Sequence, residues 1–201
     1  MFDLKAALLN KARVYIHPGE QHVTRKDMVI STLLGSCVAA CLYDQANRVV
    51  GMNHFLLASR KHISAEQLCS SQAGRYGVHA MELLINEMLK QGAERQNLRA
   101  KVFGGGAVLA ALNQRQAEAG VGEINIRFIR DFLQREKIPL ISSCLGGSQG
   151  MLIHFFAADH SVYLRRVGKV CSSHIAAEEY RYQEDLLEEF SEKERDIELW
   201  K

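Results

Sequence analysis

Two short apolar runs, separated by five residues that favour turns, constrain the fold of this chain most strongly. The first run covers Val38 to Tyr43, the second covers Val49 to Leu57, and Asp44-Gln45-Ala46-Asn47-Arg48 lies between them. Runs of this length joined by such a connection are typical of a β-hairpin. The sequence therefore predicts two adjacent antiparallel strands in this region, and any fold of the chain must contain them.

Apolar periodicity in the rest of the chain predicts a mixed fold. Short apolar runs predict further strands at 14–16, 28–34, 98–103, 139–143, 151–157 and 161–167. Helical spacing predicts helices over 78–91 and 124–136, shorter helices over 1–12 and 107–116, and a polar loop over 61–74. Since strands outnumber helices and the two types alternate, the sequence predicts an α/β domain.

Residues 175–201 differ from the rest of the chain in charge. They carry 10 acidic and 4 basic side chains, whereas the remainder carries 21 basic and 13 acidic ones. We expect a body over 1–174 and a charged, acidic C-terminal helical extension over 175–201, with Leu186, Leu187, Phe190 and Ile197 on one side. This helix could dock on the body or on a partner. The basic body could meet an acidic partner surface, although solubility alone explains its charge, and no basic stripe suggests nucleic acid.

Length and composition exclude several classes of protein. The chain has 201 residues, 47% of them hydrophobic, so one domain with a sizeable core is expected. No apolar run approaches the roughly 20 residues of a membrane helix, and residues 1–14 lack the apolar core of a signal peptide. Five cysteines without a CxxC pair argue against a disulfide framework and a structural zinc site. We therefore expect a cytoplasmic protein with reduced thiols, no cofactor, no metal and no membrane insertion.

The segment Leu34-Gly35-Ser36-Cys37 carries the strongest chemical signal. A glycine and a small residue precede Cys37, so the thiol would sit at the mouth of a strand where the backbone can turn tightly. A two- or four-residue hairpin loop would put Cys37 opposite His54, or diagonal to it on the same face. A three-residue loop without a bulge would put them on opposite faces. The spacing permits a Cys–His pair without forcing one.

A Cys–His pair has a defined chemical use. The imidazole takes the thiol proton, the thiolate acts as nucleophile, and a third polar group orients the imidazole. Ser31 and Thr32 lie just upstream, and either hydroxyl could serve. The plainer interpretation is that Cys37 is a core residue and His54 a satisfied polar one. Cys41, inside the apolar run, is expected to pack as a small hydrophobe.

Glycine clusters follow two of the predicted strands. They are Gly104-Gly105-Gly106 and Gly146-Gly147, and turn formation is their simplest role. Backbone amides at Gly35, Ser36, Gly104 and Gly105 are candidates for holding a substrate or an oxyanion. The Walker pattern is absent and the dinucleotide fingerprint is not matched, so a phosphate loop is not expected.

At these residues the sequence resembles the CheD family of chemoreceptor glutamine deamidases. The resemblance extends from about residue 14 to 168 and rests on several motifs in order. These are Thr32-Leu33-Leu34-Gly35-Ser36-Cys37-Val38-Ala39, Leu42-Tyr43-Asp44, Gly51-Met52-Asn53-His54-Phe55-Leu56-Leu57, Arg75-Tyr76-Gly77, Met81-Glu82 and Lys101-Val102-Phe103-Gly104-Gly105. The acidic extension lies outside the shared region.

The resemblance implies a fold, a reaction and a partner. The fold is a mixed-sheet α/β sandwich with flanking helices, similar to the catalytic domain of cytotoxic necrotizing factor. The reaction converts glutamine side chains of methyl-accepting chemotaxis receptors to glutamate through a cysteine thioester, with Cys37 as nucleophile, His54 as base, and Thr32 or Ser31 as third residue. The enzyme class is a cysteine hydrolase acting on linear amides, the protein-glutamine glutaminases. A CheC-type phosphatase is a further partner in some members.

Two departures from the family pattern and three rival functions accompany this resemblance. Near the later glycine pair the family often has an acid and an arginine, where this chain has Cys144 and Met151. The rivals are a non-catalytic module that binds chemoreceptors or a CheC-type phosphatase, a transglutaminase-like amidase, and a metal site of Cys37, Cys41 and His54. A metal site would lack a fourth soft ligand nearby.

Overall fold

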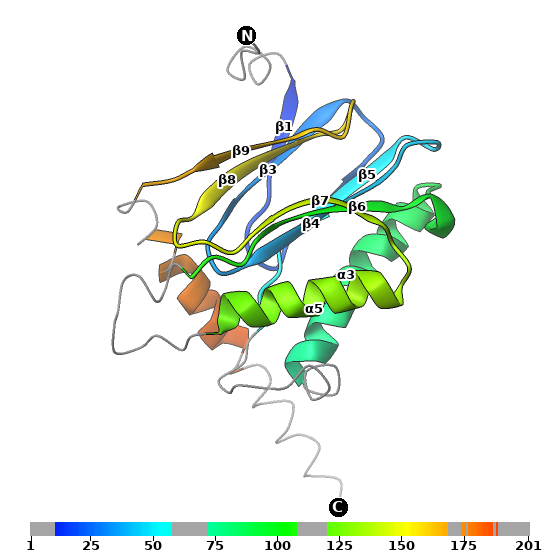
Figure 1. Ribbon diagram of the computed structural model, residues 1–201. Helices are drawn as coiled ribbons and strands as arrows, with labels where there is room; N and C mark the ends of the chain where they lie inside the picture. The colour runs from blue at the N-terminus through cyan, green and yellow to red at the C-terminus, as the bar shows by residue number, and fades with distance from the viewer. Residues whose placement is uncertain are drawn as a thin grey trace, which may run out of the picture.

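Two mixed β-sheets lie face to face, and two long helices cover the outer face of one of them (Figure 1). The computed structural model describes residues 11–57, 72–107, 120–168, 174–175, 177–186 and 188. From one side to the other, the layers are a four-stranded sheet, a five-stranded sheet and the helices. The α/β fold class predicted from the sequence, with mixed sheets packed as a sandwich, is therefore confirmed.

The four-stranded sheet is built around the strand that leads into the Leu34-Gly35-Ser36-Cys37 segment. Its order is β1 (Ala12–Tyr15), β3 (Met28–Leu34), β8 (Met151–Phe156) and β9 (Val162–Arg166). β1 runs parallel to β3, and the other two pairs are antiparallel.

The five-stranded sheet contains the predicted hairpin. Its order is β2 (Gln21–Thr24), β5 (Val49–Asn53), β4 (Val38–Asp44), β6 (Arg99–Gly104) and β7 (Leu140–Leu145). β6 and β7 are parallel and the remaining pairs are antiparallel. A 3-10 turn, η1 (Arg95–Asn97), precedes β6.

Two helices bury their apolar faces against the five-stranded sheet. They are α3 (Gln72–Lys90) and α5 (Val121–Arg135). Their buried side chains recur at helical spacing and complete one hydrophobic core with β4 and β6; they are Met81, Leu84, Ile85, Met88, Phe128, Ile129, Phe132 and Leu133. None of the described helices is long and apolar enough to cross a membrane.

β4 separates two hydrophobic cores, which explains its unbroken apolar sequence. Val38, Ala40 and Leu42 belong to the core beneath the helices. Ala39 and Cys41 belong to a second core between the two sheets. Successive side chains point to opposite faces of a strand, so a central strand covered on both faces is buried throughout.

The structure corrects several predicted boundaries. β5 ends at Asn53, short of the predicted Leu57, and α3 begins at Gln72, earlier than the predicted residue 78. β2 was not predicted, because it is a polar strand at the sheet edge in which Thr24 alone is buried. The helix expected over 1–12 lies outside the described residues except for 11 and 12, and Ala12 belongs to β1. Of the helix expected over 107–116, all but residue 107 lies outside them as well.

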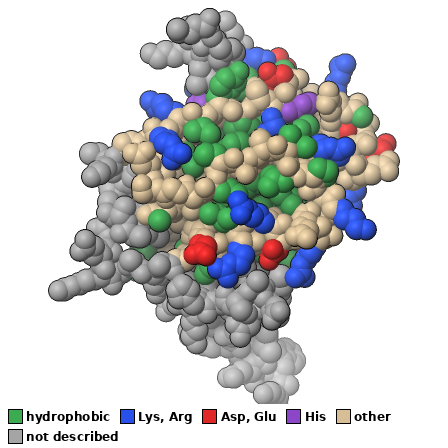
Figure 2. All heavy atoms as spheres, viewed as in Figure 1, with side chains coloured by type: hydrophobic (Ala, Val, Ile, Leu, Met, Phe, Trp, Pro, Cys, Tyr) green, Lys and Arg blue, Asp and Glu red, His purple; other side chains and the backbone are tan. Residues whose placement is uncertain are grey.

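One face of the molecule carries an apolar area ringed by basic side chains. Figure 2 shows hydrophobic side chains gathered across the middle of the face where β9, β7 and α5 are in view, with Lys and Arg around them. Leu140 and Ile141 on β7 and Leu164 on β9 are exposed apolar residues. Each of these strands is the last of its sheet among the described residues.

Candidate active site

The candidate residues meet where the chain passes from one sheet to the other. Thr32 lies on β3 of the four-stranded sheet, and Cys37 immediately precedes β4 of the five-stranded sheet. His54 follows the last residue of β5, and the chain is held beside Cys37 by paired backbone hydrogen bonds between Val38 and Phe55, at 2.9 and 3.0 Å. The site therefore draws side chains from both sheets.

Hairpin register places Cys37 and His54 on the same face. The connection between β4 and β5 has four residues, one of the lengths that allow this. Cys41 pairs with Met52, and Val38 pairs with Phe55, so Cys37 is diagonal to His54. One donor atom from each of Cys37, His54 and Glu179 lies within 4.8 Å of the others.

The hydroxyl of Thr32 fixes which nitrogen of His54 carries the proton. Thr32 Oγ1 donates to the carbonyl of Ile16 at 2.7 Å and lies 2.8 Å from His54 Nδ1. Because a hydroxyl has one proton, Oγ1 must accept the hydrogen of Nδ1. Nε2 is then the basic nitrogen, and it is buried without a hydrogen-bond partner among the described residues.

Ser31, the alternative third residue, makes a different contact. Its Oγ lies 2.8 Å from Nδ1 of His154, which pairs with it across β3 and β8. Adjacent residues of a strand point to opposite faces, so Ser31 and Thr32 cannot both face His54. The geometry brings Thr32 to His54 and directs Ser31 away.

A carboxylate from the end of the chain occupies the turn before Cys37. The helical residues 174–175, 177–186 and 188, here called the C-terminal helix, carry Glu179, which is 2% exposed. Its Oε1 accepts the amides of Gly35 and Cys37 at 2.8 and 3.1 Å. Its Oε2 accepts the amide and the hydroxyl of Ser36, both at 2.7 Å. Three consecutive amides thus converge on one anion.

Glu179 was not among the residues predicted from the sequence, which left open whether the C-terminal helix docks on the body or on a partner; it docks on the body. One signal could have found Glu179. Ile175, Glu179, Tyr182 and Leu186 recur at helical spacing, and a carboxylate inside an otherwise apolar stripe needs hydrogen-bond partners once the stripe is buried. The predicted stripe included Leu186, which is buried; Leu187, Phe190 and Ile197 are not among the residues whose side chains the structure describes.

Glycines behind the site support the Cys37 turn. The Gly105 amide donates to the Cys37 carbonyl at 2.7 Å, and the Gly106 amide donates to the Gly35 carbonyl at 2.7 Å. Gly104 has a φ of 110°, and a Cβ there would collide with the Cys37 carbonyl. The amides of Gly35 and Ser36 therefore face the carboxylate, whereas that of Gly105 is engaged by the backbone of Cys37.

Asn125, near the start of α5, is a second support that sequence reasoning missed. It is fully buried, its Nδ2 donates to the Ser36 carbonyl, and its Oδ1 accepts the Leu57 amide, both at 2.8 Å. It thereby ties the turn before Cys37 to the segment after His54. A polar residue one helical turn into an amphipathic helix carries no local signal of such a role.

Cys37 and His54 are both uncharged in this structure. Burial, reinforced by the charge of Glu179 and a hydrogen bond to it, raises the pKa of the Cys37 thiol well above its usual value. Burial lowers the pKa of His54 to about 3. Cys37 is 0% exposed and His54 is 1% exposed. Both groups are therefore uncharged at neutral pH, and solvent does not reach them in this arrangement.

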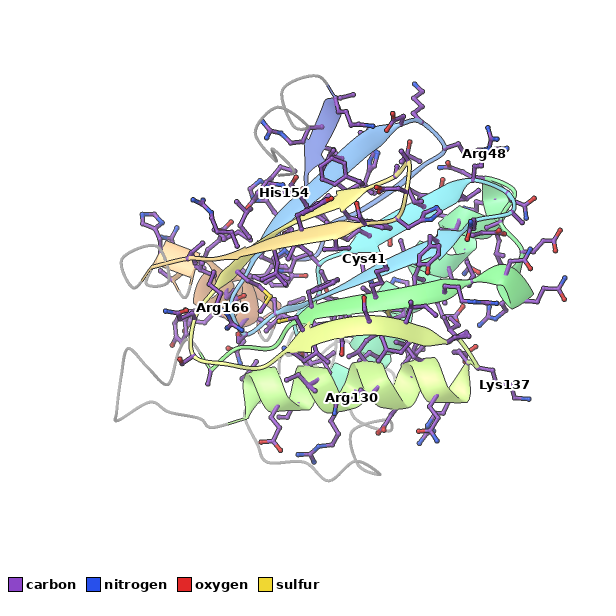
Figure 3. All side chains as sticks on the ribbon, turned by 45° about the horizontal axis from the view of Figure 1, so that its top comes forward. Cys41, Arg48, Arg130, Lys137, His154 and Arg166 are labelled. Atoms are coloured by element: carbon purple, nitrogen blue, oxygen red, sulfur yellow. The ribbon has the colours of Figure 1, made fainter. Side chains whose placement is uncertain are left out.

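The remaining candidate residues lie outside this cluster. Cys41 lies between the sheets, and His154 lies on the four-stranded sheet (Figure 3). Cys144 is half-buried on β7, opposite Phe103. Met151 is buried at the start of β8, opposite Leu34, so it packs beneath the turn.

The donor set of Cys37, His54 and Glu179 could in principle hold a metal ion. Both oxygens of Glu179, however, already accept two hydrogen bonds each. Cys41, the ligand considered from sequence, is not part of this donor set. The geometry therefore describes a carboxylate bound by amides rather than a cage for a cation.

The fold and the site together define an α/β sandwich with a buried cysteine–histidine–threonine cluster beside an anion-binding turn. Residues 56–166 match the model of the family described as CheD chemotactic sensory transduction. A protein of Geobacter sulfurreducens, named probable chemoreceptor glutamine deamidase CheD 1, is 44% identical over 93% of each chain. A protein of Shewanella oneidensis, named probable chemoreceptor glutamine deamidase CheD 2, is 48% identical over 93% of this chain and 94% of its own. The chain belongs to the CheD family.

Proposed function

We propose that this protein hydrolyses the side-chain amide of glutamine residues on chemoreceptors, giving glutamate and ammonia. The names of its relatives supply the substrate, and the cluster of Cys37, His54 and Thr32 supplies the chemistry. One observation carries the assignment: Thr32 engages Nδ1 of His54, which leaves Nε2, without a partner among the described residues, as the basic nitrogen of a ring that has one nitrogen within 4.8 Å of the Cys37 sulfur.

The first half of the proposed reaction forms a thioester. His54 Nε2 takes the thiol proton, and the Cys37 sulfur attacks the carboxamide carbon of the substrate. The carbonyl oxygen becomes an oxyanion, and the amides of the Cys37 turn are oriented to receive it. His54 then gives its proton to the amide nitrogen, the carbon–nitrogen bond breaks, and ammonia leaves.

The second half releases the product. His54 Nε2 takes a proton from water, and the resulting hydroxide attacks the thioester carbon. The carbon–sulfur bond breaks, the thiolate recovers its proton from His54, and the carboxylic acid left on the receptor loses its proton to solvent to become glutamate. Its carboxylate would fit the same amides that bind Glu179 in the structure.

Deamidation of a purified receptor cytoplasmic fragment tests this function. Peptide mass spectrometry would locate each glutamine that becomes glutamate, and Cys37→Ala should remove every conversion. The matched control is Cys41→Ala, which deletes a buried thiol of the same hairpin that lies between the sheets. Conversion that persists in Cys37→Ala would refute the proposed nucleophile.

The proposed setting follows from the substrate. Glutamines on the cytoplasmic part of a receptor would be reached from the cytoplasm, where thiols stay reduced. A CheC-type phosphatase is a proposed partner on the resemblance alone. A purely non-catalytic binding role is not favoured, since it would give no reason for a basic nitrogen held beside a buried thiol.

A further inference from the structure

We propose that Glu179 is an intramolecular analogue of the reaction product, and that the C-terminal helix closes the active site until a glutamine-bearing helix of the substrate takes its place. This inference rests on the proposed function, because it assigns the carboxylate the position of the product glutamate. It assigns the acidic extension a regulatory role and predicts which residues should flank a glutamine that the enzyme accepts.

The carboxylate of Glu179 is bound as a product carboxylate would be. Its four hydrogen bonds come from the turn that ends in Cys37, at 2.7–3.1 Å. A glutamate side chain is also what the proposed reaction leaves behind. A buried carboxylate is costly unless hydrogen bonds satisfy it, and here backbone amides and a hydroxyl provide them.

The C-terminal helix docks through one face, centred on this glutamate. Ile175 packs against Gly35 and Gly150, where an added Cβ would come within 2.9 and 2.7 Å of it. Tyr182 packs against Gly19 in the same way, and its hydroxyl meets that of Tyr76. Glycines at these positions leave the space that a helix needs to reach the turn.

The rim of this interface is polar. Glu178 lies 3.2 Å from Nδ1 of His17, and both side chains are more than half exposed. Exposed pairs of this kind contribute little stability. The buried side chains of the helix are Ile175, Glu179, Gln183 and Leu186, and Tyr182 is partly buried. Figure 1 shows the helix at the ends of the strands, beside the start of α5, rather than between the sheets.

Docking makes the nucleophile unreachable. Cys37 and His54 are sealed, at 0% and 1% exposed, and the amides needed for the oxyanion are occupied. A receptor glutamine cannot contact the sulfur while Glu179 remains in place. The helix must leave before turnover, and its departure also removes a negative charge that opposes thiolate formation.

The docked face also describes the substrate that would replace it. It presents Glu179, whose side chain has the length of glutamine. Apolar residues lie four positions before Glu179 (Ile175), three after it (Tyr182) and seven after it (Leu186). We expect a receptor helix that replaces the C-terminal helix to carry apolar residues at the positions of Ile175, Tyr182 and Leu186. Glutamines lacking such neighbours should be poor substrates.

Alkylation of the full-length protein with iodoacetamide tests the closure without reference to deamidation. Cys37 modification would be followed by peptide mass spectrometry in wild type, Glu179→Ala and Glu179→Gln. Loss of a hydrogen bond to a charged group should speed modification of Cys37 by at least about tenfold. The matched control, Glu184→Ala, removes an exposed charge from the same helix and should match wild type.

The chain contains its own folding control for this experiment. Cys41 is buried between the sheets and should stay protected in every variant that remains folded. Fast Cys37 modification with Cys41 protected supports the closure. A Cys37 rate in both Glu179 variants equal to that of wild type overturns it. Should Glu179→Ala also expose Cys41, the isosteric Glu179→Gln decides on the same criteria, and exposure of Cys41 there too would make Glu179 a structural residue and end the proposal.

Receptor deamidation by the same proteins separates this inference from the proposed function. If Glu179→Ala unmasks Cys37 and converts glutamines faster than wild type, both stand. If it unmasks Cys37 but no glutamine is converted, the closure stands and the deamidase assignment fails. If wild type deamidates the receptor and the Glu179 variants neither unmask Cys37 nor act faster, the deamidase stands and the closure fails.

Discussion

The hydroxyl of Thr32 lies 2.8 Å from Nδ1 of His54 while it donates its proton to the carbonyl of Ile16. This relationship sets the tautomer of the imidazole, because an oxygen that gives away its one proton can only accept from the ring. It also links the two sheets, since Thr32 belongs to β3 and His54 follows β5.

Thr32→Ala should therefore lower the rate constant for glutamine conversion by up to about 100-fold, through loss of imidazole orientation. Thr32→Ser keeps the hydroxyl and should retain most activity. The matched control is Ser31→Ala, which removes the buried contact to His154 and should cost about 1–3 kcal/mol of stability with little effect on turnover. Steady-state deamidation rates and urea unfolding of the three variants measure both effects. A larger kinetic loss in Ser31→Ala than in Thr32→Ala would contradict the assignment.

The buried imidazole predicts a pH dependence of stability. The pKa of His54 is about 3 in the folded protein and 6.5 as the ordinary value, so the unfolded chain binds the extra proton between these pH values. The contribution to stability is complete above pH 6.5 and is lost as the pH falls towards 3, at most about 1.4 kcal/mol per pH unit.

Chemical denaturation between pH 4 and 7 checks this slope, with His54→Gln as the control because its amide does not titrate in that range. Carboxylates and other histidines titrate in both proteins, so the difference in slope isolates His54. Parallel curves for the two proteins would show that His54 is not buried in its neutral form.

Asn125→Ala should weaken the turn before Cys37. It leaves the Ser36 carbonyl and the Leu57 amide without their partner, at about 1–3 kcal/mol for each buried group. Asn125→Asp should separate the two contacts, since a carboxylate accepts from Leu57 but cannot donate to Ser36. Unfolding free energy and deamidation rate should both fall in Asn125→Ala. Wild-type values for both would show that the turn holds its shape without this side chain.

A pair of glycine substitutions separates backbone strain from damage to the site. Gly104→Ala and Gly92→Ala both put a side chain at positive φ, 110° and 96°, at a cost of about 1–3 kcal/mol each. At Gly104 the added Cβ also meets the Cys37 carbonyl, whereas at Gly92 the nearest atom belongs to the flexible side chain of Arg25, at 3.5 Å. Both variants should lose stability, but Gly104→Ala should lose deamidation activity as well. Equal activity in the two would exclude a supporting role for Gly104.

Much of the fold was predictable because its signals are local. The hairpin of β4 and β5 was evident from two apolar runs and the turn residues between them, and its four-residue connection is one of the lengths that bring Cys37 and His54 to one face. The strand β2 was not predictable, because its pairing with β5 at the sheet edge buries little of its side-chain surface. Its stability comes from a neighbour distant in sequence.

The sequence pattern could not decide whether Ser31 or Thr32 contacts His54. Apolar residues flank both hydroxyls along β3, so alternation alone did not tell which face looks towards β5. The pairing of β3 with β8, and of Ser31 with His154, decides it. The apolar stripe of the C-terminal helix marks Glu179 as a carboxylate that needs partners, but those partners lie 142–144 residues earlier in the chain, so the sequence could not name them.

Thr32 and His54 belong to different sheets, and Cys37 lies where the chain crosses between them. The geometry of the cluster therefore depends on how the two sheets are aligned. A small slide of one sheet over the other would part the hydroxyl from the ring long before either sheet lost its own strand pairing. Conservative replacements in the core between the sheets, such as Ile153→Val at the fully buried position that pairs with Thr32, should thus lower turnover. The deamidation rate should therefore respond to a shift between the two sheets more strongly than the free energy of unfolding does.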